Sequence, residues 1–422
     1  MKKNHLAQYG LLAVIVGFTA SLFYIFDFVA RVMPSAMTHE LMQAFSVQAG
    51  ALGVLSSLFF YGYAPMQIPA GILLDKLGAR KVLTLSLLFS ALATLAFAYT
   101  SHLGVAMVCR FIMGFMAAFA YIGALKVGAH WFKAQHFAIY ASLVQIFGCV
   151  GAIVGEGPVA KLTAEYGWQH ASILVAVLGF IFAVLTVLIV RNHPPKPWAN
   201  YIGHTINLAE KEKSLPFWHI FKSRTIWVSA LYGFAIWSPI SIFAVLWGVP
   251  FLSRAYHLTN VNAASSLSFV WIGVAVGGPI ITTLSSWLKQ RRLMMIASSL
   301  IGLISGVWMI YFPPSSTALL IIFLLLFGAA ASSMALTFAL IMDTQPKSLI
   351  ATASGFINMA IVLGGLTLQP AVGFILDAIW KGQVDASGGP IYSIGDYQTG
   401  LMVVPISFAI ALLTALFLVQ KK

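Results

Sequence analysis

The amino-acid sequence predicts an all-α membrane protein with twelve transmembrane helices in two pseudo-symmetric six-helix bundles. Three observations support this prediction: the composition, the number of long apolar segments, and a polar stretch near the middle of the chain. Of the 422 residues, 60% are apolar and only 8% are charged, whereas soluble domains carry roughly a quarter charged residues. This composition excludes a water-soluble fold and an intrinsically disordered chain.

Twelve segments are long and apolar enough to cross a bilayer, which takes about 20 helical residues for about 30 Å. They contain several prolines, which are tolerated in such helices because neighbouring helices satisfy the freed backbone groups. The predicted spans lie near residues 9–33, 47–70, 82–100, 103–126, 137–160, 169–190, 226–252, 263–287, 293–312, 317–342, 352–377 and 400–419.

The longest segment between predicted spans is polar and divides the chain near its middle. It covers residues 192–225 and predicts a linker between an N-terminal bundle, residues 1–191, and a C-terminal bundle, residues 226–422. The halves repeat each other. At one constant offset, Gln145 and Glu156 of the fifth span correspond to Asn358 and Gln369 of the eleventh, so both halves turn a polar stripe toward a shared cavity.

The basic residues are distributed unequally between the two sides of the membrane. If the N-terminus is cytosolic, the inner segments carry eighteen Lys and Arg residues and the outer loops three. By the positive-inside rule, both termini are therefore predicted to be cytosolic. This distribution accounts for the net charge of +13 without a nucleic-acid partner. Since the only cysteines, Cys109 and Cys149, lie inside apolar runs, neither a metal site nor a cofactor is expected.

The loop between the second and third spans carries the most specific motif. Residues 71–81 read GILLDKLGARK, which resembles the loop signature of the major facilitator superfamily. In the equivalent loop of the second half, Ser286 stands in place of the acid. The resemblance implies the major facilitator fold and transport by alternating access.

The same motif predicts a conformational latch. Asp75 is expected to pair with Arg80 or Lys81, or to meet a helix N-terminus of the opposite half. The alternative is a solvated loop whose basic residues only set topology. The residues assigned to the latch are Gly71, Asp75, Gly78, Arg80 and Lys81.

Other motifs bear on the kind of transporter. Arg110 and Gly114 resemble the family's fourth-span arginine motif, which many members use in proton coupling. The fifth span resembles the Gly/Pro motif of proton-driven exporters but departs from it after Pro158. Residues 26–35 and 61–69 resemble bacterial nutrient-uptake carriers of the phagosomal transporter type.

Four ionisable residues lie inside predicted spans, where each costs roughly 2.5–3.5 kcal/mol and is a functional hypothesis by default. Asp27 and Arg31 are one helical turn apart and can form a pair, and Arg110 and Glu156 are predicted at a similar depth. We predict a proton-coupling network of these four residues. The alternative is a permanent structural network that pins the first, fourth and fifth spans together.

Polar and aromatic residues on the same spans predict the substrate cavity. Lys126, at the inner end of the fourth span, fits either a snorkelling anchor or a substrate contact. The residues predicted to line the cavity are Tyr24, Tyr121, Gln145, Trp237, Asn358 and Gln369.

These observations predict a monomeric secondary active transporter of a bacterial inner membrane and not an enzyme. Its expected partners are protons, the lipid bilayer and a small-molecule substrate. The function expected is import of a small polar or zwitterionic solute, such as an amino acid, a peptide or a related nutrient. The alternatives are a proton-driven exporter of drugs or siderophores and a non-transporting membrane sensor.

Overall fold

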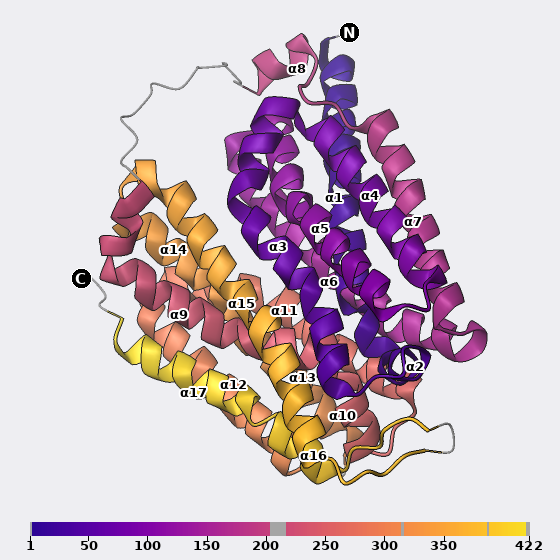
Figure 1. Ribbon diagram of the computed structural model, residues 1–422. Helices are drawn as coiled ribbons and strands as arrows, with labels where there is room; N and C mark the ends of the chain where they lie inside the picture. The colour runs from indigo at the N-terminus through magenta and orange to yellow at the C-terminus, as the bar shows by residue number, and fades with distance from the viewer. Residues whose placement is uncertain (1, 203–216, 314–315, 386–387, 419–422) are drawn as a thin grey trace.

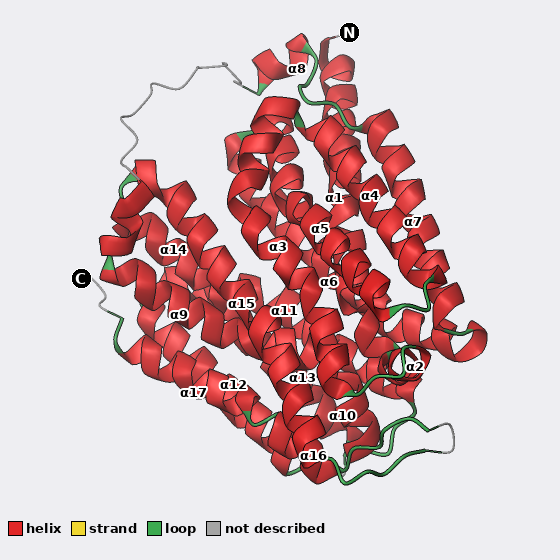
Figure 2. Ribbon diagram, viewed as in Figure 1, coloured by secondary structure: helices red, strands yellow, loops and turns green. Residues whose placement is uncertain are grey.

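The computed structural model describes residues 2–202, 217–313, 316–385 and 388–418. Within these ranges the protein is a bundle of helices, shown in red in Figure 2, and its only strand-like pairing is an isolated bridge between Val384 and Pro390. Eleven helices are long and apolar enough to span a membrane, and twelve if a bent pair is counted as one span. The predicted fold class is thereby confirmed.

The first half contains six long helices and two short ones. Its short helices are α2, which turns by 109° into the start of the next helix, and α8, which lies in the predicted linker. The bounds are α1 Lys2–Ala36, α2 Thr38–Ala44, α3 Ala49–Leu77, α4 Ala79–Tyr99, α5 Leu103–Trp131, α6 Ala134–Tyr166, α7 Trp168–Ile189 and α8 Lys196–Tyr201.

The second half contains six spans, three of which are interrupted. The seventh consists of α9, η2 and α10, the tenth of α13, η3 and α14, and the twelfth of α16 and α17. The bounds are η1 Phe217–Lys222, α9 Arg224–Pro239, η2 Ile240–Trp247, α10 Gly248–Ala255, α11 Asn260–Leu288, α12 Arg291–Tyr311, α13 Thr317–Ala331, η3 Ser332–Met334, α14 Ala335–Thr344, α15 Lys347–Ile379, α16 Ile394–Gly400 and α17 Val403–Leu416.

Proline explains the interruption of the seventh span. Pro239 ends α9, and the following residues form the π-helix η2. Proline has no amide hydrogen and its ring clashes with the carbonyl four residues earlier, so the regular hydrogen-bond pattern cannot continue through it. Single turns of π-helix commonly occur at functional sites, and η2 lies against α1 of the other half.

Glycines at helix crossings repeat between the two halves. A Cβ on Gly114 of α5 would overlap the carbonyl oxygen of Phe59 in α3, and a Cβ on Gly328 of α13 would overlap that of Val270 in α11. These are the second and fourth spans of each half. Since only glycine permits so close an approach, both halves use the same crossing.

The two halves meet at one end of the molecule and diverge toward the other (Figure 1). Between the halves, α3 packs against α15, α6 against α11, and α1 against η2. In Figure 1, α2, α10 and α16 lie at the end where the halves meet, called here the closed end, and the start of α1 and α8 lie at the other, called the open end. The central residues of the predicted linker, 203–216, fall outside the described ranges.

Replacing Gly114 by alanine should destabilise the first half, because α3 and α5 would have to move apart. Overpacking of this kind costs about 1–3 kcal/mol. Gly104, in the same helix, has nothing within 4 Å of a Cβ, so Gly104→Ala is the matched control. Thermal unfolding of the purified protein should show a lower midpoint for Gly114→Ala than for Gly104→Ala, and equal midpoints would contradict the close crossing.

Candidate functional site

Asp27 and Arg31 form a buried ion pair on α1. The Arg31 Nη2 atom donates to both carboxylate oxygens of Asp27, at 3.1 and 2.9 Å. The Arg31 side chain is 7% exposed and that of Asp27 is 0% exposed. The two residues are one helical turn apart, as the sequence predicts, and each supplies the counter-charge that the other needs away from water.

Aromatic rings surround the guanidinium group of Arg31. Its central carbon lies 4.4 Å from the ring centre of Phe28, 4.9 Å from that of Tyr63 and 5.2 Å from that of Phe59. Cations are attracted to ring faces at such distances, and more strongly where water is excluded. Arg31 Nε has no hydrogen-bond partner, so the ion pair with Asp27 leaves one N–H donor of the Arg31 guanidinium group unused.

Arg110 on α5 is fully buried and contacts backbone carbonyls. It donates to Ala30 O at 2.6 Å, and to Arg31 O and Ser56 O at 3.4 Å each. These carbonyls belong to α1 and α3, so Arg110 joins three helices of the first half. No ion pair of Arg110 with Asp27 or Glu156 is found among the described residues.

Glu156 on α6 contacts the other half of the molecule. Its Oε1 atom accepts a hydrogen bond from the indole nitrogen of Trp271 on α11, at 2.8 Å. The residue is fully buried and its Oε2 atom has no partner. The rings of Trp271 and Phe28 are nearly perpendicular, with ring centres 5.6 Å apart, so Trp271 contacts both Glu156 and the aromatic surroundings of Arg31.

The structure thus separates the four buried charges into three sites. Asp27 pairs with Arg31, Arg110 holds backbone carbonyls, and Glu156 faces Trp271. The predicted single network is not formed in this conformation. The sequence around Trp271 is apolar and offers no signal that this particular indole faces an acid 115 positions away.

Three of the predicted cavity residues lie together. A cavity of about 240 Å³ lies between the halves. Tyr24 OH donates to Gln145 Oε1 at 3.4 Å, and its ring centre is 5.1 Å from that of Tyr121. The lining residues include Tyr121, Ser142, Gln145, Val274, Pro279, Thr282, Ser332 and Phe338.

The other three predicted cavity residues lie elsewhere. Trp237 is buried in α9. Asn358 donates to Gln67 Oε1 of the other half at 2.6 Å, and Gln369 is fully buried and donates to Ser241 O at 2.6 Å. Within the described residues, none of the three lines the 240 Å³ cavity.

The loop motif has different partners from those predicted. Asp75 pairs with Lys126 of α5 at 2.5 Å, and not with Arg80 or Lys81. Arg80 instead donates to Val187 O at the end of α7. Gly78 has a φ of 81°, a backbone conformation that favours glycine. Gly71 has nothing within 4 Å of the position of a Cβ, and Lys81 is exposed. All these contacts are within the first half, so the latch is not engaged with the second half here.

An acid that the sequence analysis missed joins the halves at the closed end. Asp377, near the end of α15, accepts hydrogen bonds from the first two amides of α3, Ala49 N at 3.0 Å and Gly50 N at 2.8 Å. Tyr392 OH also donates to it, at 2.6 Å. A carboxylate at a helix N-terminus is favourable because it satisfies free amides and the helix dipole. This is the contact expected of Asp75, made at the opposite end of the molecule.

No group of three or more metal-binding side chains is found in the part of the chain that the structure describes. The site consists of buried charges, hydrogen bonds between the halves and a cavity of about 240 Å³ between them. Such an arrangement suits binding and movement of a solute.

Comparison with known proteins identifies the family. The profile described as Major Facilitator Superfamily matches residues 14–368. The chain belongs to the major facilitator superfamily.

Relatives and solved structures agree with this assignment. The chain is 22% identical to a probable galactarate/D-glucarate transporter of Escherichia coli strain K12, over 93% of this chain and 90% of the relative. It is also 22% identical to a probable sulfoacetate transporter of Cupriavidus necator, over 84% and 85%. A crystal structure of a bacterial homologue of the human lysosomal transporter Spinster covers 96% of both chains with a TM-score of 0.77 at 16% identity. The protein is therefore a membrane transporter of a small molecule and not an enzyme.

Replacing Asp377 should weaken the closed end, because the start of α3 would lose a charged partner. Hydrogen bonds to charged groups contribute about 1.5–3 kcal/mol, so Asp377→Ala should raise the population open at this end by roughly tenfold. Asp396 caps α16 within the second half, so Asp396→Ala is the matched control.

A buried thiol can report this opening. Ser57 is buried on the face of α3 that also carries Gly53, which meets Gln369 and Pro370 of α15. In a Ser57→Cys protein without Cys109 and Cys149, a thiol reagent applied from the closed end should react roughly tenfold faster when Asp377 is replaced. A rate unchanged by Asp377→Ala, or raised equally by Asp396→Ala, would contradict this role.

Proposed function

We propose that the protein, acting as a monomer, imports a small organic anion together with a proton by alternating access. The observation that carries this proposal is the separation of the buried charges. Two arginines, Arg31 and Arg110, lie near one ionised acid, Asp27, while Glu156 faces an indole in place of a cation. The arginines therefore leave one positive charge for an anionic solute to balance.

The relatives favour the same class of solute. Their names refer to galactarate, D-glucarate and sulfoacetate, and a probable L-galactonate transporter and a hexuronate transporter are also similar to the chain. All of these compounds carry a carboxylate or sulfonate group. An anion of this kind replaces the amino acid or peptide favoured by the sequence alone as the preferred solute.

The charge distribution supports an orientation of the protein in the membrane. The excess of Lys and Arg on the side of the N-terminus predicts that this side is cytosolic. The open end would then face the cytosol and the closed end the outside, so the structure would be inward-facing. Both termini would be cytosolic in the bacterial inner membrane.

Glu156 is the preferred proton site. It is fully buried with a single hydrogen bond, from Trp271, and an unpaired carboxylate is costly in such a place. On the helices packed against α6, Asp27 and Arg31 of α1 pair with each other and Arg110 of α5 holds backbone carbonyls. Lys126 of α5 pairs with Asp75, and α11 carries no charged residue. The closed state therefore favours the neutral, protonated form of Glu156. Asp27 is a weaker candidate because Arg31 already balances its charge.

Opening of the closed end would couple the proton to the solute. Separation of α6 from α11 would break the bond between Glu156 and Trp271 and bring the carboxyl group into contact with outside water, from which it can take up a proton. Trp271 would also leave Phe28, which lies against Arg31. The solute could then reach the arginine, and reclosure would require Glu156 to hold a proton taken from outside. Release of the solute and of this proton to the cytosol would leave an ionised Glu156, which favours reopening of the closed end.

A panel of uptake assays in proteoliposomes tests the solute class. Galactarate, sulfoacetate, an amino acid and a dipeptide are supplied outside, with and without an acidic exterior. We expect accumulation of an anion, raised by the proton gradient. Gradient-driven accumulation of the dipeptide alone would contradict the anion proposal, and gradient-driven extrusion would contradict import.

Substitution of Glu156 tests the proton site. One coupled proton supports roughly tenfold accumulation per pH unit of gradient, because one pH unit corresponds to 1.36 kcal/mol. Glu156→Gln should abolish this accumulation yet retain exchange of solute, since exchange needs no net proton movement. Glu165→Gln is the control, because Glu165 lies on the same helix and is exposed. Accumulation by Glu156→Gln that keeps the wild-type pH dependence would exclude Glu156 as the proton site.

A further inference from the structure

The cavity between the halves has an uncharged lining. Its volume of about 240 Å³ is below the roughly 300–1,000 Å³ of pockets that hold drug-sized ligands, so it has room for a small solute. None of the described residues that line it is charged. Apolar side chains, such as those of Val274 and Phe338, are mixed with the hydroxyl groups of Ser142, Thr282 and Ser332. Selection of a solute in this cavity therefore depends on hydrogen bonds and shape, not on ion pairs.

The three hydroxyl groups already donate their hydrogens within the protein. Each donates to a backbone carbonyl one turn earlier in the chain: Ser142 to Ala138 O at 3.0 Å, Thr282 to Gly278 O at 2.8 Å and Ser332 to Ala329 O at 2.6 Å. A hydroxyl group has one hydrogen and two lone pairs, and serine and threonine in helices commonly bond to the preceding turn in this way. A solute in the cavity therefore meets these oxygens as hydrogen-bond acceptors.

Pro279 adds a backbone acceptor to the same wall. It lies inside α11 and lines the cavity together with Ala275. Proline has no amide hydrogen, so it cannot donate to the carbonyl group four residues earlier, which is that of Ala275. In a transmembrane helix, such a carbonyl takes its hydrogen bond from a neighbouring group or from water. The helix α11 thus supplies two acceptors, the carbonyl of Ala275 and the hydroxyl of Thr282.

Neutral acceptors of this kind suit the hydroxyl groups of a solute. An ammonium group or a metal ion also binds to neutral oxygens, but a buried cation needs a counter-charge, and no acid is among the described lining residues. An ionised carboxylate or sulfonate group offers no hydrogen to an acceptor. A hydroxyl group is neutral and donates one hydrogen, so it satisfies both conditions.

Both halves of the molecule contribute acceptors. Ser142 belongs to α6 of the first half, whereas Thr282 lies on α11 and Ser332 in η3 of the second. A solute with several hydroxyl groups along its carbon chain can therefore bond to both halves at once. Its C–H groups would lie against the apolar part of the lining, which includes Val274 and Phe338.

We propose that this cavity selects organic acids whose carbon chain carries several hydroxyl groups, and that Ser142, Thr282 and Ser332 set this specificity by accepting hydrogen bonds from the solute. The inference rests on the proposed function, import of an organic anion, and adds which anions are taken. An acid of the same length and charge that lacks hydroxyl groups leaves these acceptors without a donor, and a site with unpaired polar groups rejects such an analogue.

Exchange of labelled galactarate and of labelled adipate by proteoliposomes at neutral pH tests the selection. Both acids are dianions with a six-carbon chain, and adipate lacks the hydroxyl groups. Exchange needs no proton gradient, so the comparison does not depend on the proton site. Galactarate should be exchanged at least tenfold more efficiently than adipate, because several hydrogen bonds are lost with adipate and each contributes about fivefold.

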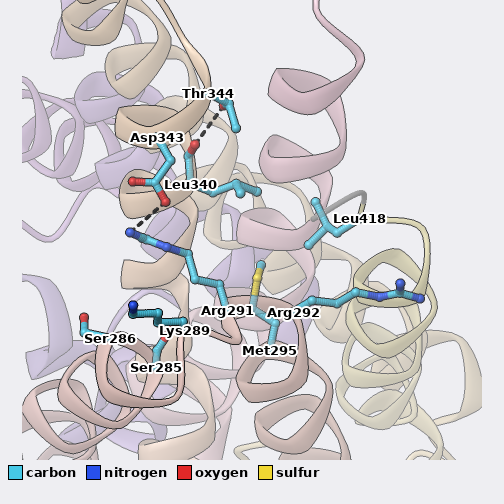
Figure 3. A pocket seen from close by; sticks show the side chains of 10 residues that line it. All are labelled: Ser285, Ser286, Lys289, Arg291, Arg292, Met295, Leu340, Asp343, Thr344 and Leu418. Atoms are coloured by element: carbon cyan, nitrogen blue, oxygen red, sulfur yellow. Dashed lines mark hydrogen bonds and ion pairs between the residues drawn. The ribbon is translucent and has the colours of Figure 1, made fainter. Parts of the chain in front are cut away.

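Substitutions test the residues assigned to this specificity. Ser142→Ala and Thr282→Val each remove one acceptor, so each should lower the preference for galactarate over adipate by about fivefold and leave exchange of adipate unchanged. Ser286→Ala is the matched control. Ser286 also lies on α11 and donates to Thr282 O at 2.9 Å, but it lines a separate cavity among the ends of α11, α14 and α17 (Figure 3). A purely structural role would change the exchange of both acids alike.

The outcomes separate this inference from the proposed function. Equal exchange of galactarate and adipate, or exchange of sulfoacetate in place of galactarate, would overturn the selection and leave anion transport standing. More efficient exchange of 2-aminoadipate than of galactarate would overturn it in favour of an ammonium group. A preference unchanged in both Ser142→Ala and Thr282→Val, or lowered equally in Ser286→Ala, would overturn the role of these hydroxyl groups. If none of these acids is exchanged, the proposed function fails, and this inference fails with it.

Discussion

The hydrocarbon core of a bilayer offers no hydrogen bonds, so each buried polar group of this protein needs a partner within the protein itself. This constraint explains the contacts of the central region. Asp27 pairs with Arg31, Arg110 holds backbone carbonyls, and Glu156 takes the indole of Trp271. The first two contacts lie inside one half, whereas the third crosses to the other. A movement between the halves therefore disturbs Glu156 and leaves the arginines in place.

The polar contacts between the halves are concentrated on a few helix pairs. On α3 and α15, Asp377 holds the start of α3 and Asn358 meets Gln67. Glycine permits these helices to lie close together, since a Cβ on Gly53 would meet the backbone of Gln369 and Pro370. Each half, in contrast, is held internally by crossings of the kind seen at Gly114. The halves are thus suited to move as units about a polar interface.

Much of the fold could be predicted from the sequence, because apolar length and glycine-rich spans are local properties. The pair of Asp27 and Arg31 could also be predicted, because both residues lie on one turn of one helix. The contacts made by Asp75, Asp377 and Glu156 could not. Each depends on which distant helix packs opposite the acid: α5 for Asp75, α3 for Asp377 and α11 for Glu156. Asp377 falls at the end of a predicted span, where an acid usually marks only the boundary between the membrane-spanning segment and the following loop.

The central claim is that protonation of Glu156 accompanies closure of α6 against α11, and a distance measured against pH tests it most directly. Spin labels can be attached at the exposed positions Tyr166, at the end of α6, and Asn262, at the start of α11, because the native Cys109 and Cys149 are buried. The wild type should show a short distance at low pH and a growing population of a longer distance as the pH rises. The distance distribution of Glu156→Gln should not change with pH. A wild-type distance that does not change with pH, or a change that persists in Glu156→Gln, would contradict the claim.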